Sequence, residues 1–350
     1  MSGNAWPEHI VKSGPSGLDN GGHFTSRDEG NSRLGDVCGM SRRNPMPVEA
    51  KVSVVIPAWI HGSFDMLRDS ITSVLSQRFR DFHLIVVDDG SPVPVELDRL
   101  GIRDPRVRCL RQANGGPSIA RNRGILHSVS EYVAFLDADD LWHPDKLGLQ
   151  VTYMDAHPEA ILCYTDYSRG ESPASARSRL AYYRPRQPGD EFHDLLRENF
   201  VLTSSVLVRR SALSQSGLFD PSLKGPEDID LWLRLARIGR FGFVDEILVH
   251  KIDHGNNLSS SPEFLRNSIV MIDRWLQVVG DGDIAHDLLL RKKRDRVYSL
   301  AYLCKRNGWL SEARQNYIAC ARLGLRPLKN YLAAGMLSLP KRVVKRLLLH

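Results

Sequence analysis

Short apolar runs alternate with amphipathic stretches from residue 51 onward, and this alternation limits what the chain can fold into. The apolar runs predict buried strands, and the amphipathic stretches predict helices. Strands are expected at 52–56, 83–87, 107–110 and 132–136, with helices at 66–77 and 118–128. Because strand, helix and strand follow one another at crossover spacing, the sequence predicts an α/β fold with a largely parallel sheet.

Composition divides the chain into three parts. Residues 1–49 are rich in Gly, Ser, Asn, Asp and Pro without apolar periodicity, so they are expected to be disordered. Residues 50–262 should form the α/β domain, which continues with a strand at 204–208 and a helix at 227–238. Residues 263–350 are expected to be a helical extension, in which 298–323, with a turn at Gly308, resembles one tetratricopeptide-type helix pair.

The net charge of +6 is unevenly distributed along the chain. The last 65 residues, from His286 onward, carry +12, whereas the preceding 285 carry −6. A basic, apolar-rich tail fits peripheral contact with an anionic membrane surface or an acidic ligand, although a solvated helical face gives the same pattern. The five scattered cysteines and the lack of an apolar run of transmembrane length predict a cytoplasmic protein with reduced thiols.

Three of the predicted strands run directly into polar or aromatic residues. In parallel sheets, ligands bind at the carboxyl ends of the strands, so these segments are expected to line one site. They are Pro57-Ala58-Trp59, Asp88-Asp89-Gly90-Ser91 and Asp137-Ala138-Asp139-Asp140.

The acidic segment 137–140 has two interpretations. Carboxylates two residues apart at a strand end can both reach one hard cation, which is commonly shared with nucleotide phosphates. An aspartate in this position can instead cap the first turn of a helix. Because three acids beside a buried strand repel one another, the metal interpretation is favoured.

Other residues could bind a nucleotide or act in catalysis. Trp59 could stack on a base or belong to the core, and Asp89 could accept hydrogen bonds from a base or ribose or serve only in a turn. Asn114 opens a segment whose helix carries Arg121, which could meet a diphosphate or be an ordinary surface arginine. Asp228 could be a general base or a cap for its helix.

Taken in order, these segments resemble the large family 2 of nucleotide-sugar glycosyltransferases, whose fold is called GT-A. The resemblance runs from 52 to 261, and each landmark is weak by itself. The landmarks are VSVVIP at 52–57, SVLSQ at 73–77, VDDGS at 87–91, ARN at 120–122, FLDADD at 135–140 and EDIDLW at 227–232. The resemblance implies a GT-A domain, which is a mixed and mostly parallel sheet flanked by helices, followed by a C-terminal helical extension.

The resemblance also implies roles for single residues. Pro57, Ala58 and Trp59 would line the nucleotide pocket, Asp89 would contact the base, and Asn114 and Arg121 would add to the donor site. Asp137 would contact the ribose or the metal, and Asp139 would bind Mn²⁺ or Mg²⁺. His254 would lie near the diphosphate and the metal, and Asp228 would deprotonate the acceptor.

The expected function is therefore metal-dependent, inverting transfer of a sugar from a nucleotide-diphosphate sugar to a hydroxyl of a glycan or lipid-linked acceptor, in polysaccharide or cell-envelope biosynthesis. No nucleic-acid partner is expected. The alternatives are nucleotidyl transfer to a sugar phosphate and non-catalytic binding of a nucleotide-sugar. The first normally has a glycine-rich, basic loop after the first strand, where this chain has Ala58-Trp59-Ile60-His61.

The chain departs from the family pattern at three places. Ile60 replaces the usual asparagine, 92–93 is Pro-Val where Thr-Asp is common, and Ser130 replaces a glycine. None of them is a proposed metal ligand or the base. The first two put base or donor preference in doubt, whereas Ser130 is expected to affect only a turn. The donor sugar, the acceptor and the linkage depend on loops such as 168–188, which carry no transferable signature.

Overall fold

The computed structural model describes residues 50–170, 177–178, 189–252 and 261–337. The expectation of disorder for 1–49 and the basic residues beyond 337 lie outside the described residues.

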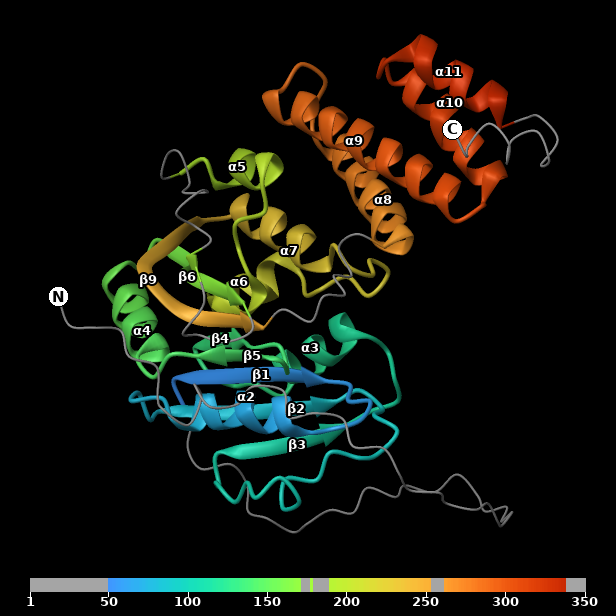
Figure 1. The fold of residues 1–350 in the computed structure, drawn as a ribbon. Coiled ribbons are helices and arrows are strands. Elements are labelled where there is room, and N and C mark those ends of the chain that lie inside the picture. The colour runs from blue at the N-terminus through green and yellow to red at the C-terminus, as the bar shows by residue number, and fades with distance from the viewer. Residues whose placement is uncertain (1–49, 171–176, 179–188, 253–260, 338–350) are drawn as a thin grey trace, which may run out of the picture.

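The described elements begin with strands interspersed with helices and end in four consecutive helices (Figure 1). In chain order they are β1 (Val52–Ala58), α2 (Asp65–Leu75), β2 (Phe82–Asp88), β3 (Val107–Arg111), α3 (Pro117–Leu126), β4 (Tyr132–Phe135), β5 (Asp140–Trp142), α4 (Lys146–Ala156), β6 (Ala160–Gly170), β7 (Arg177–Ser178), α5 (Glu191–Arg197), the 3₁₀ turn η3 (Thr203–Ser205), β8 (Leu207–Arg209), α6 (Arg210–Ser216), α7 (Glu227–Ala236), β9 (Arg240–Ile252), α8 (Pro262–Val278), α9 (Ile284–Arg306), α10 (Leu310–Arg322) and α11 (Pro327–Met336).

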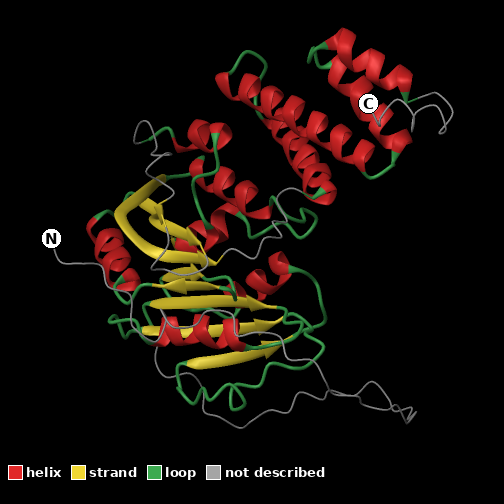
Figure 2. Ribbon diagram, in the orientation of Figure 1, coloured by secondary structure: helices red, strands yellow, loops and turns green. Residues whose placement is uncertain are grey.

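A mixed sheet forms the centre of the molecule, with helices on both faces (Figure 2). Its strand order across the described residues is β3-β2-β1-β4-β8-β6-β9-β5, with β7 paired to β6. The neighbours β3-β2-β1-β4 are all parallel, and β6 and β9 form a long parallel ladder. The antiparallel ladders, of two or three residue pairs, join β8 to β4 and β6, β7 to β6, and β5 to β9 at one end of the sheet. The predicted mixed, mostly parallel α/β fold is confirmed.

The strands in the second half of the sheet were harder to predict from the sequence. We predicted none of β5, β6 and β9, because β5 is short and begins with an aspartate, and β6 and β9 follow irregular registers. The strand expected at 204–208 is corrected: β8 begins at Leu207, and η3 precedes it. The backbone N–H of Ser205 donates to the Leu202 carbonyl at 2.8 Å, which closes a turn in place of a strand.

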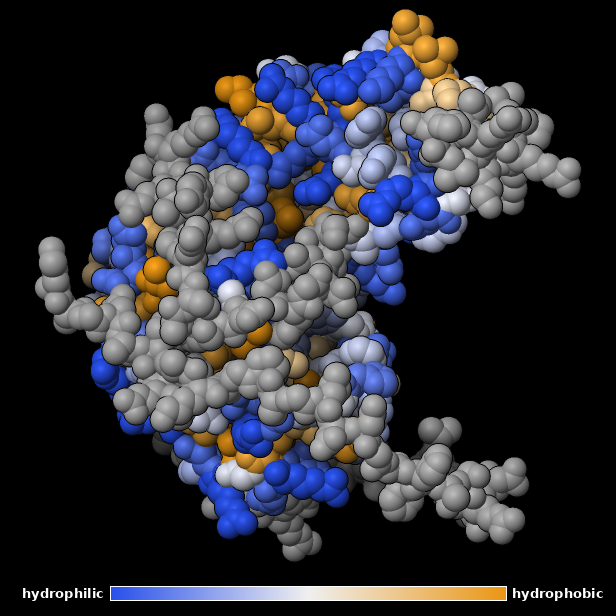
Figure 3. Space-filling view, viewed as in Figure 1, coloured by the Kyte–Doolittle hydropathy of each residue, from blue (hydrophilic) through white to orange (hydrophobic). Residues whose placement is uncertain are grey.

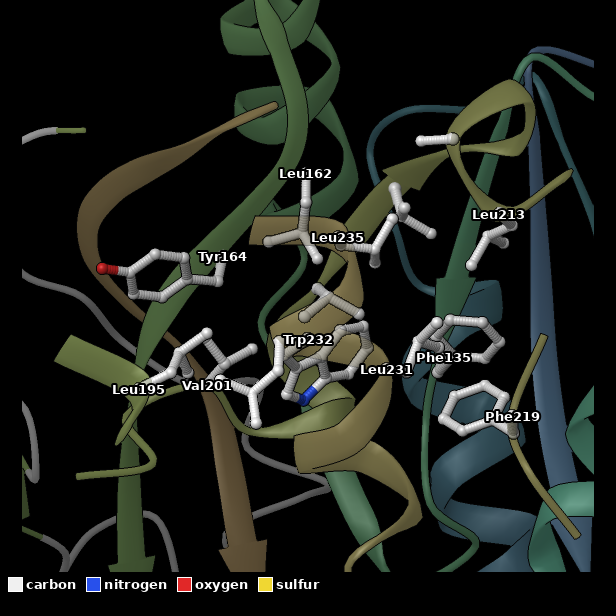
Figure 4. Close-up of a cluster of buried hydrophobic side chains, with 14 of the residues drawn as sticks. Phe135, Leu162, Tyr164, Leu195, Val201, Leu213, Phe219, Leu231, Trp232 and Leu235 are labelled. Atoms are coloured by element: carbon white, nitrogen blue, oxygen red, sulfur yellow. The ribbon is translucent and has the colours of Figure 1, made fainter. Parts of the chain in front are cut away.

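Alternate residues of β1 point into two hydrophobic cores. Val52, Val54 and Ile56 pack in the layer that includes the apolar faces of α2 and α4. Val55 points into the opposite layer, which contains residues of α3, α5, α6 and α7. Figure 4 shows part of this second core, where Trp232 of α7 lies among leucines and phenylalanines. Packing on both faces of the sheet therefore fixes β1 and the helices that cover it.

The C-terminal helices extend away from the sheet, as the prediction of a helical extension requires (Figure 1). Gly308, with φ of 76°, forms the turn between α9 and α10, as expected for the helix pair. The face of this extension that Figure 3 shows is largely hydrophilic, with apolar side chains in a few separate groups. None of the helices in the described part of the chain is long and apolar enough to cross a membrane.

Two helical glycines give a test of this packing. A Cβ on Gly124 of α3 would overlap the Val55 side chain of β1, whereas one on Gly148 of α4 would meet its nearest neighbour, the Phe79 Cβ, at 3.9 Å. We expect Gly124→Ala to lower the free energy of unfolding by about 2 kcal/mol through overpacking. Gly148→Ala should raise it by up to about 1 kcal/mol through helix propensity. Urea unfolding measures both, and equal effects would contradict the proposed α3 contact.

Candidate active site

The three polar strand ends lie together at one edge of the sheet. The backbone N–H of Asp89, after β2, donates to the Ala58 carbonyl of β1 at 2.8 Å, and the N–H of Leu136, after β4, donates to the Val55 carbonyl at 3.1 Å. The parallel registers of β1 with β2 and β4 therefore bring Trp59, Asp89 and Asp137 to the same edge, as predicted.

Arg121 of α3 joins this edge to α7. Its Nη2 lies 2.8 Å from Asp137 Oδ1, and its Nη1 lies 3.2 Å from Glu227 Oε1. The guanidinium also lies over the Phe219 ring, 5.4 Å from the centroid, and the side chain is 7% exposed. The surface-arginine interpretation is therefore wrong. Burial opposes its positive charge, but Asp137 and Glu227 outweigh burial and raise the pKa of Arg121.

Glu227 is one of the site residues to which sequence reasoning gave no role. Its Oε1 accepts from Arg121, and its Oε2 accepts the backbone N–H of Gly225 at 2.7 Å. As an acid in the first turn of α7, it had the pattern of a simple helix cap. The only sequence signal for more was its place beside Asp228 in the 227–232 landmark.

The acidic segment 137–140 ends β4 and begins β5. Asp137 is partly exposed; burial opposes its ionisation, but Arg121 and then Lys251 outweigh burial and hold its pKa below the ordinary value. Asp139 is also partly exposed. Asp140 is buried, and its burial, together with the charges of Asp137 and Asp139, raises its pKa to about 7 against the influence of Lys251. Its Oδ1 has no partner among the described residues.

Lys251 of β9 supplies a second positive charge. It lies opposite Asp140 in the antiparallel β5–β9 ladder. Burial opposes its charge, but Asp140, Asp137 and Asp139 in turn raise its pKa. Sequence reasoning gave Lys251 no role, because only the long-range pairing of β5 with β9 brings it to the acidic segment.

Asp228 lies in the first turn of α7, next to Glu227. Its Oδ1 accepts the backbone N–H of Ile229 at 2.7 Å, and its Oδ2 accepts from the Thr203 hydroxyl at 3.4 Å. Burial, and after it the charge of Glu227, raises the pKa of Asp228 to about 7, although Arg121 acts in the opposite direction. A carboxylate with this pKa can accept a proton near neutral pH.

Hydrogen bonds in both directions connect Asp89 with the segment around Asn114. The Asp89 carboxylate accepts the backbone N–H groups of Gly115 and Gly116 at 2.9 and 2.7 Å, and the Gln112 amide at 2.7 Å. The Asn114 side chain donates to the Asp89 carbonyl at 3.0 Å. In this structure Asp89 therefore fixes the loop that leads into α3, and its predicted contact with a base stays a prediction.

Trp59 is 54% exposed at the end of β1 and makes an edge contact with His61. The core interpretation of Trp59 is therefore wrong, and its face is accessible for stacking. Pro57 is partly exposed, whereas the Ala58 side chain is buried in the core beneath α2.

The predicted metal ligands are only partly described. Asp137 and Asp139 lie at the site, but His254 falls outside the described residues. Within those residues, no group of three or more His, Cys, Asp or Glu side chains has the arrangement of a complete metal site.

Sequence comparison shows which known proteins this chain is similar to. The model of the family described as glycosyl transferase family 2 matches residues 53–217. A Rickettsia felis protein named as an uncharacterized glycosyltransferase is 29% identical over 239 residues, covering 67% of this chain. The chain spans 38% of the length of that relative. The succinoglycan biosynthesis protein ExoW of Rhizobium meliloti is 43% identical over 103 residues, which are 28% of this chain and 32% of ExoW.

The fold also matches solved structures. Residues 1–349 of TarS from Staphylococcus aureus, in complex with UDP, superpose with a TM-score of 0.59 at 17% identity, covering 84% of this chain and 90% of that one. At this identity the likeness concerns the fold, and it agrees with the GT-A architecture expected from the sequence.

The Arg121 ion pairs can be tested by stability. Arg121→Met leaves Asp137 and Glu227 without their shared cation, so we expect a loss of about 3 kcal/mol of unfolding free energy at pH 7. Because Arg121 lowers the pKa of Asp137, this contribution is present above the unfolded pKa and is lost as the pH falls through the lower folded pKa. The difference from wild type should therefore shrink below about pH 4.

The matched control is Arg123→Met, on the same helix. Arg123 makes no ion pair within the described residues, so its replacement should change stability by less than about 0.5 kcal/mol. Equal losses in urea unfolding for the two variants would contradict the role of Arg121.

Proposed function

Residues 53–217 belong to glycosyl transferase family 2, and on that premise we propose that the chain is an inverting glycosyltransferase. It would transfer a sugar from a nucleotide-diphosphate sugar to a hydroxyl of a glycan or lipid-linked acceptor, in polysaccharide or cell-envelope biosynthesis. One observation carries the proposal: Asp228, with a pKa of about 7, is linked through Glu227 and Arg121 to the acidic segment at the end of β4.

The proposed reaction needs one base. The acceptor oxygen forms a bond to the anomeric carbon while the bond from that carbon to the diphosphate breaks, which inverts the centre. Asp228 would take the proton from the acceptor hydroxyl as this happens. A base works best when its pKa lies near the working pH, and burial beside Glu227 brings Asp228 there.

The departing nucleoside diphosphate needs positive charge. Asp139 and Asp137 would hold Mn²⁺ or Mg²⁺, and His254 is a further candidate ligand. The residues fit such an ion: carboxylate oxygens are the donors that hard cations prefer, and the buried Asp140 Oδ1 has no partner within the described segments. When bound, the cation would act as a Lewis acid on the leaving diphosphate.

The donor nucleotide would lie across the ends of β1 and β2. The exposed Trp59 offers a face for the base, and the loop that Asp89 holds brings Asn114 and the start of α3 to the same edge. Arg121 is engaged by two carboxylates, so we propose that it acts on the donor through Asp137.

The base assignment is tested by Asp228→Asn. With Mn²⁺ and a panel of nucleotide-sugars, we expect donor hydrolysis to fall by at least about 100-fold while UDP binding, measured by calorimetry, is largely kept. In the wild type, kcat/KM should be lost as the pH falls through about 7, because only the ionised carboxylate accepts a proton. The variant should lack this acidic limb.

Asp273→Asn, at an exposed carboxylate of α8 paired with Lys293, is the matched control and should retain wild-type turnover. A non-catalytic binding protein predicts that Asp228→Asn has no effect on any activity. Indifference of the wild type to every donor would contradict the proposed function as a whole.

Acceptors on lipid carriers would place the enzyme at the cytoplasmic face of the membrane, so we also propose that the basic tail gives peripheral contact. Each basic residue near an anionic surface contributes about 1 kcal/mol. Replacing Lys341, Arg342, Lys345 and Arg346 by glutamine should therefore greatly weaken sedimentation with anionic vesicles and leave UDP binding unchanged. Unchanged vesicle binding would exclude this role.

A further inference from the structure

The 3₁₀ turn η3, Thr203–Ser205, contacts both acidic groups of the site. All three of its residues are buried. Its hydroxyl groups reach the acidic segment on one side and Asp228 on the other. No motif in the sequence pointed to this turn, and sequence reasoning placed its last two residues in a strand.

Ser204 bridges two residues of the acidic segment. Its hydroxyl donates to Asp140 Oδ2 at 2.6 Å and accepts the backbone N–H of Asp137 at 3.1 Å. The hydroxyl therefore fixes both ends of the four-residue segment that contains Asp139. Because a hydroxyl has one hydrogen and can accept at its lone pairs, both bonds can form together.

Thr203 reaches the other side of the site. Its hydroxyl donates to Asp228 Oδ2 at 3.4 Å, while Asp228 Oδ1 accepts the Ile229 N–H. The two bonds restrict the rotation of the carboxylate. Neighbouring residues of one turn thus contact the candidate base and the acidic segment that carries two of the candidate metal ligands.

Buried side chains also fix the backbone of the turn through hydrogen bonds. Trp142 donates its indole N–H to the Ser204 carbonyl at 2.8 Å, and Gln150 donates to the Ser205 carbonyl at 2.9 Å. The Lys146 Nζ lies 2.6 Å from Gln150 Oε1 and 4.0 Å from the centre of the Trp142 ring. The polar network is buried throughout, so the position of the turn is closely determined.

We propose that η3 is a positioning element, in which Ser204 sets the geometry of the acidic segment for a divalent cation and Thr203 orients Asp228. This inference rests on the proposed function. Replacing a residue that is hydrogen-bonded to a metal ligand commonly changes the metal affinity by 10–100-fold. Each hydroxyl donates to a carboxylate of the site, so both residues would act through that carboxylate.

Ser204→Ala tests the first half. We expect at least about tenfold weaker binding of Mn²⁺ in the presence of UDP, measured by electron paramagnetic resonance of free Mn²⁺. Ser205→Ala is the matched control, because it removes an equally buried hydroxyl of the same turn that donates only to the Leu202 carbonyl at 2.7 Å. It should bind Mn²⁺ as the wild type does. Ser204→Thr, which restores a hydroxyl, should recover most of the affinity.

Thr203→Val tests the second half with a variant of the same shape. Loss of a donor to the carboxylate raises the pKa of Asp228, so kcat/KM should fall roughly threefold at pH 6 and remain unchanged above pH 8. Mn²⁺ binding should stay at the wild-type level.

The outcomes separate the two levels of the proposal. If the wild type binds Mn²⁺ with UDP and Ser204→Ala binds it equally well, or if Ser205→Ala weakens binding as much, the positioning role is wrong. If the wild type binds no Mn²⁺ in the presence of UDP, the metal part of the proposed function is wrong. The proposed role of Ser204 is then wrong as well. An unchanged pH profile in Thr203→Val overturns the role of Thr203.

Discussion

The buried ion pairs of Arg121 are the interaction on which the rest of the site depends. One guanidinium connects helix α3, the end of β4 and the first turn of α7, three segments that are far apart in the sequence. Around it, five carboxylates share the site with two cations: Asp137, Asp139, Asp140, Glu227 and Asp228 with Arg121 and Lys251. The excess of negative charge, combined with burial, explains why two of the carboxyl groups titrate near neutrality. Added positive charge would stabilise such a site.

The environment, and not the residue type, separates two acidic pairs with similar sequences. At the end of β2, Asp88 is fully buried, accepts the backbone N–H groups of Ser91 and Val95, and pairs with Arg111. Asp89 is likewise satisfied by backbone N–H groups and by Gln112. After β4, the charges of Asp137 and Asp139 act on the buried Asp140 and raise its pKa. Backbone donors make the first pair structural, whereas in the second pair Asp140 Oδ1 has no hydrogen-bond partner among the described residues.

Sequence reasoning reached the parallel half of the fold because β1, β2 and β4 are apolar and regular, and helices α2 and α3 lie between strands of this half. It failed for β5 and β9, whose pairing depends on residues more than a hundred positions apart. The same division holds for the site. Asp137 and Asp228 follow from local motifs, and the structure connects them. Glu227, Ser204 and Lys251 could not be identified, because their roles arise from contacts between distant segments.

Helix α9 has a consequence for the chain as a folding unit. Its first half, with Ala285 and Leu289, belongs to the same hydrophobic core as Trp232 of α7 and Trp275 of α8. Its second half, with Leu300 and Cys304, belongs to a separate core shared with α10 and α11. A shortened or chimeric protein would therefore have to be joined within α9, beyond Leu289. A junction placed where the sheet ends would remove the apolar support of the helix that carries Asp228.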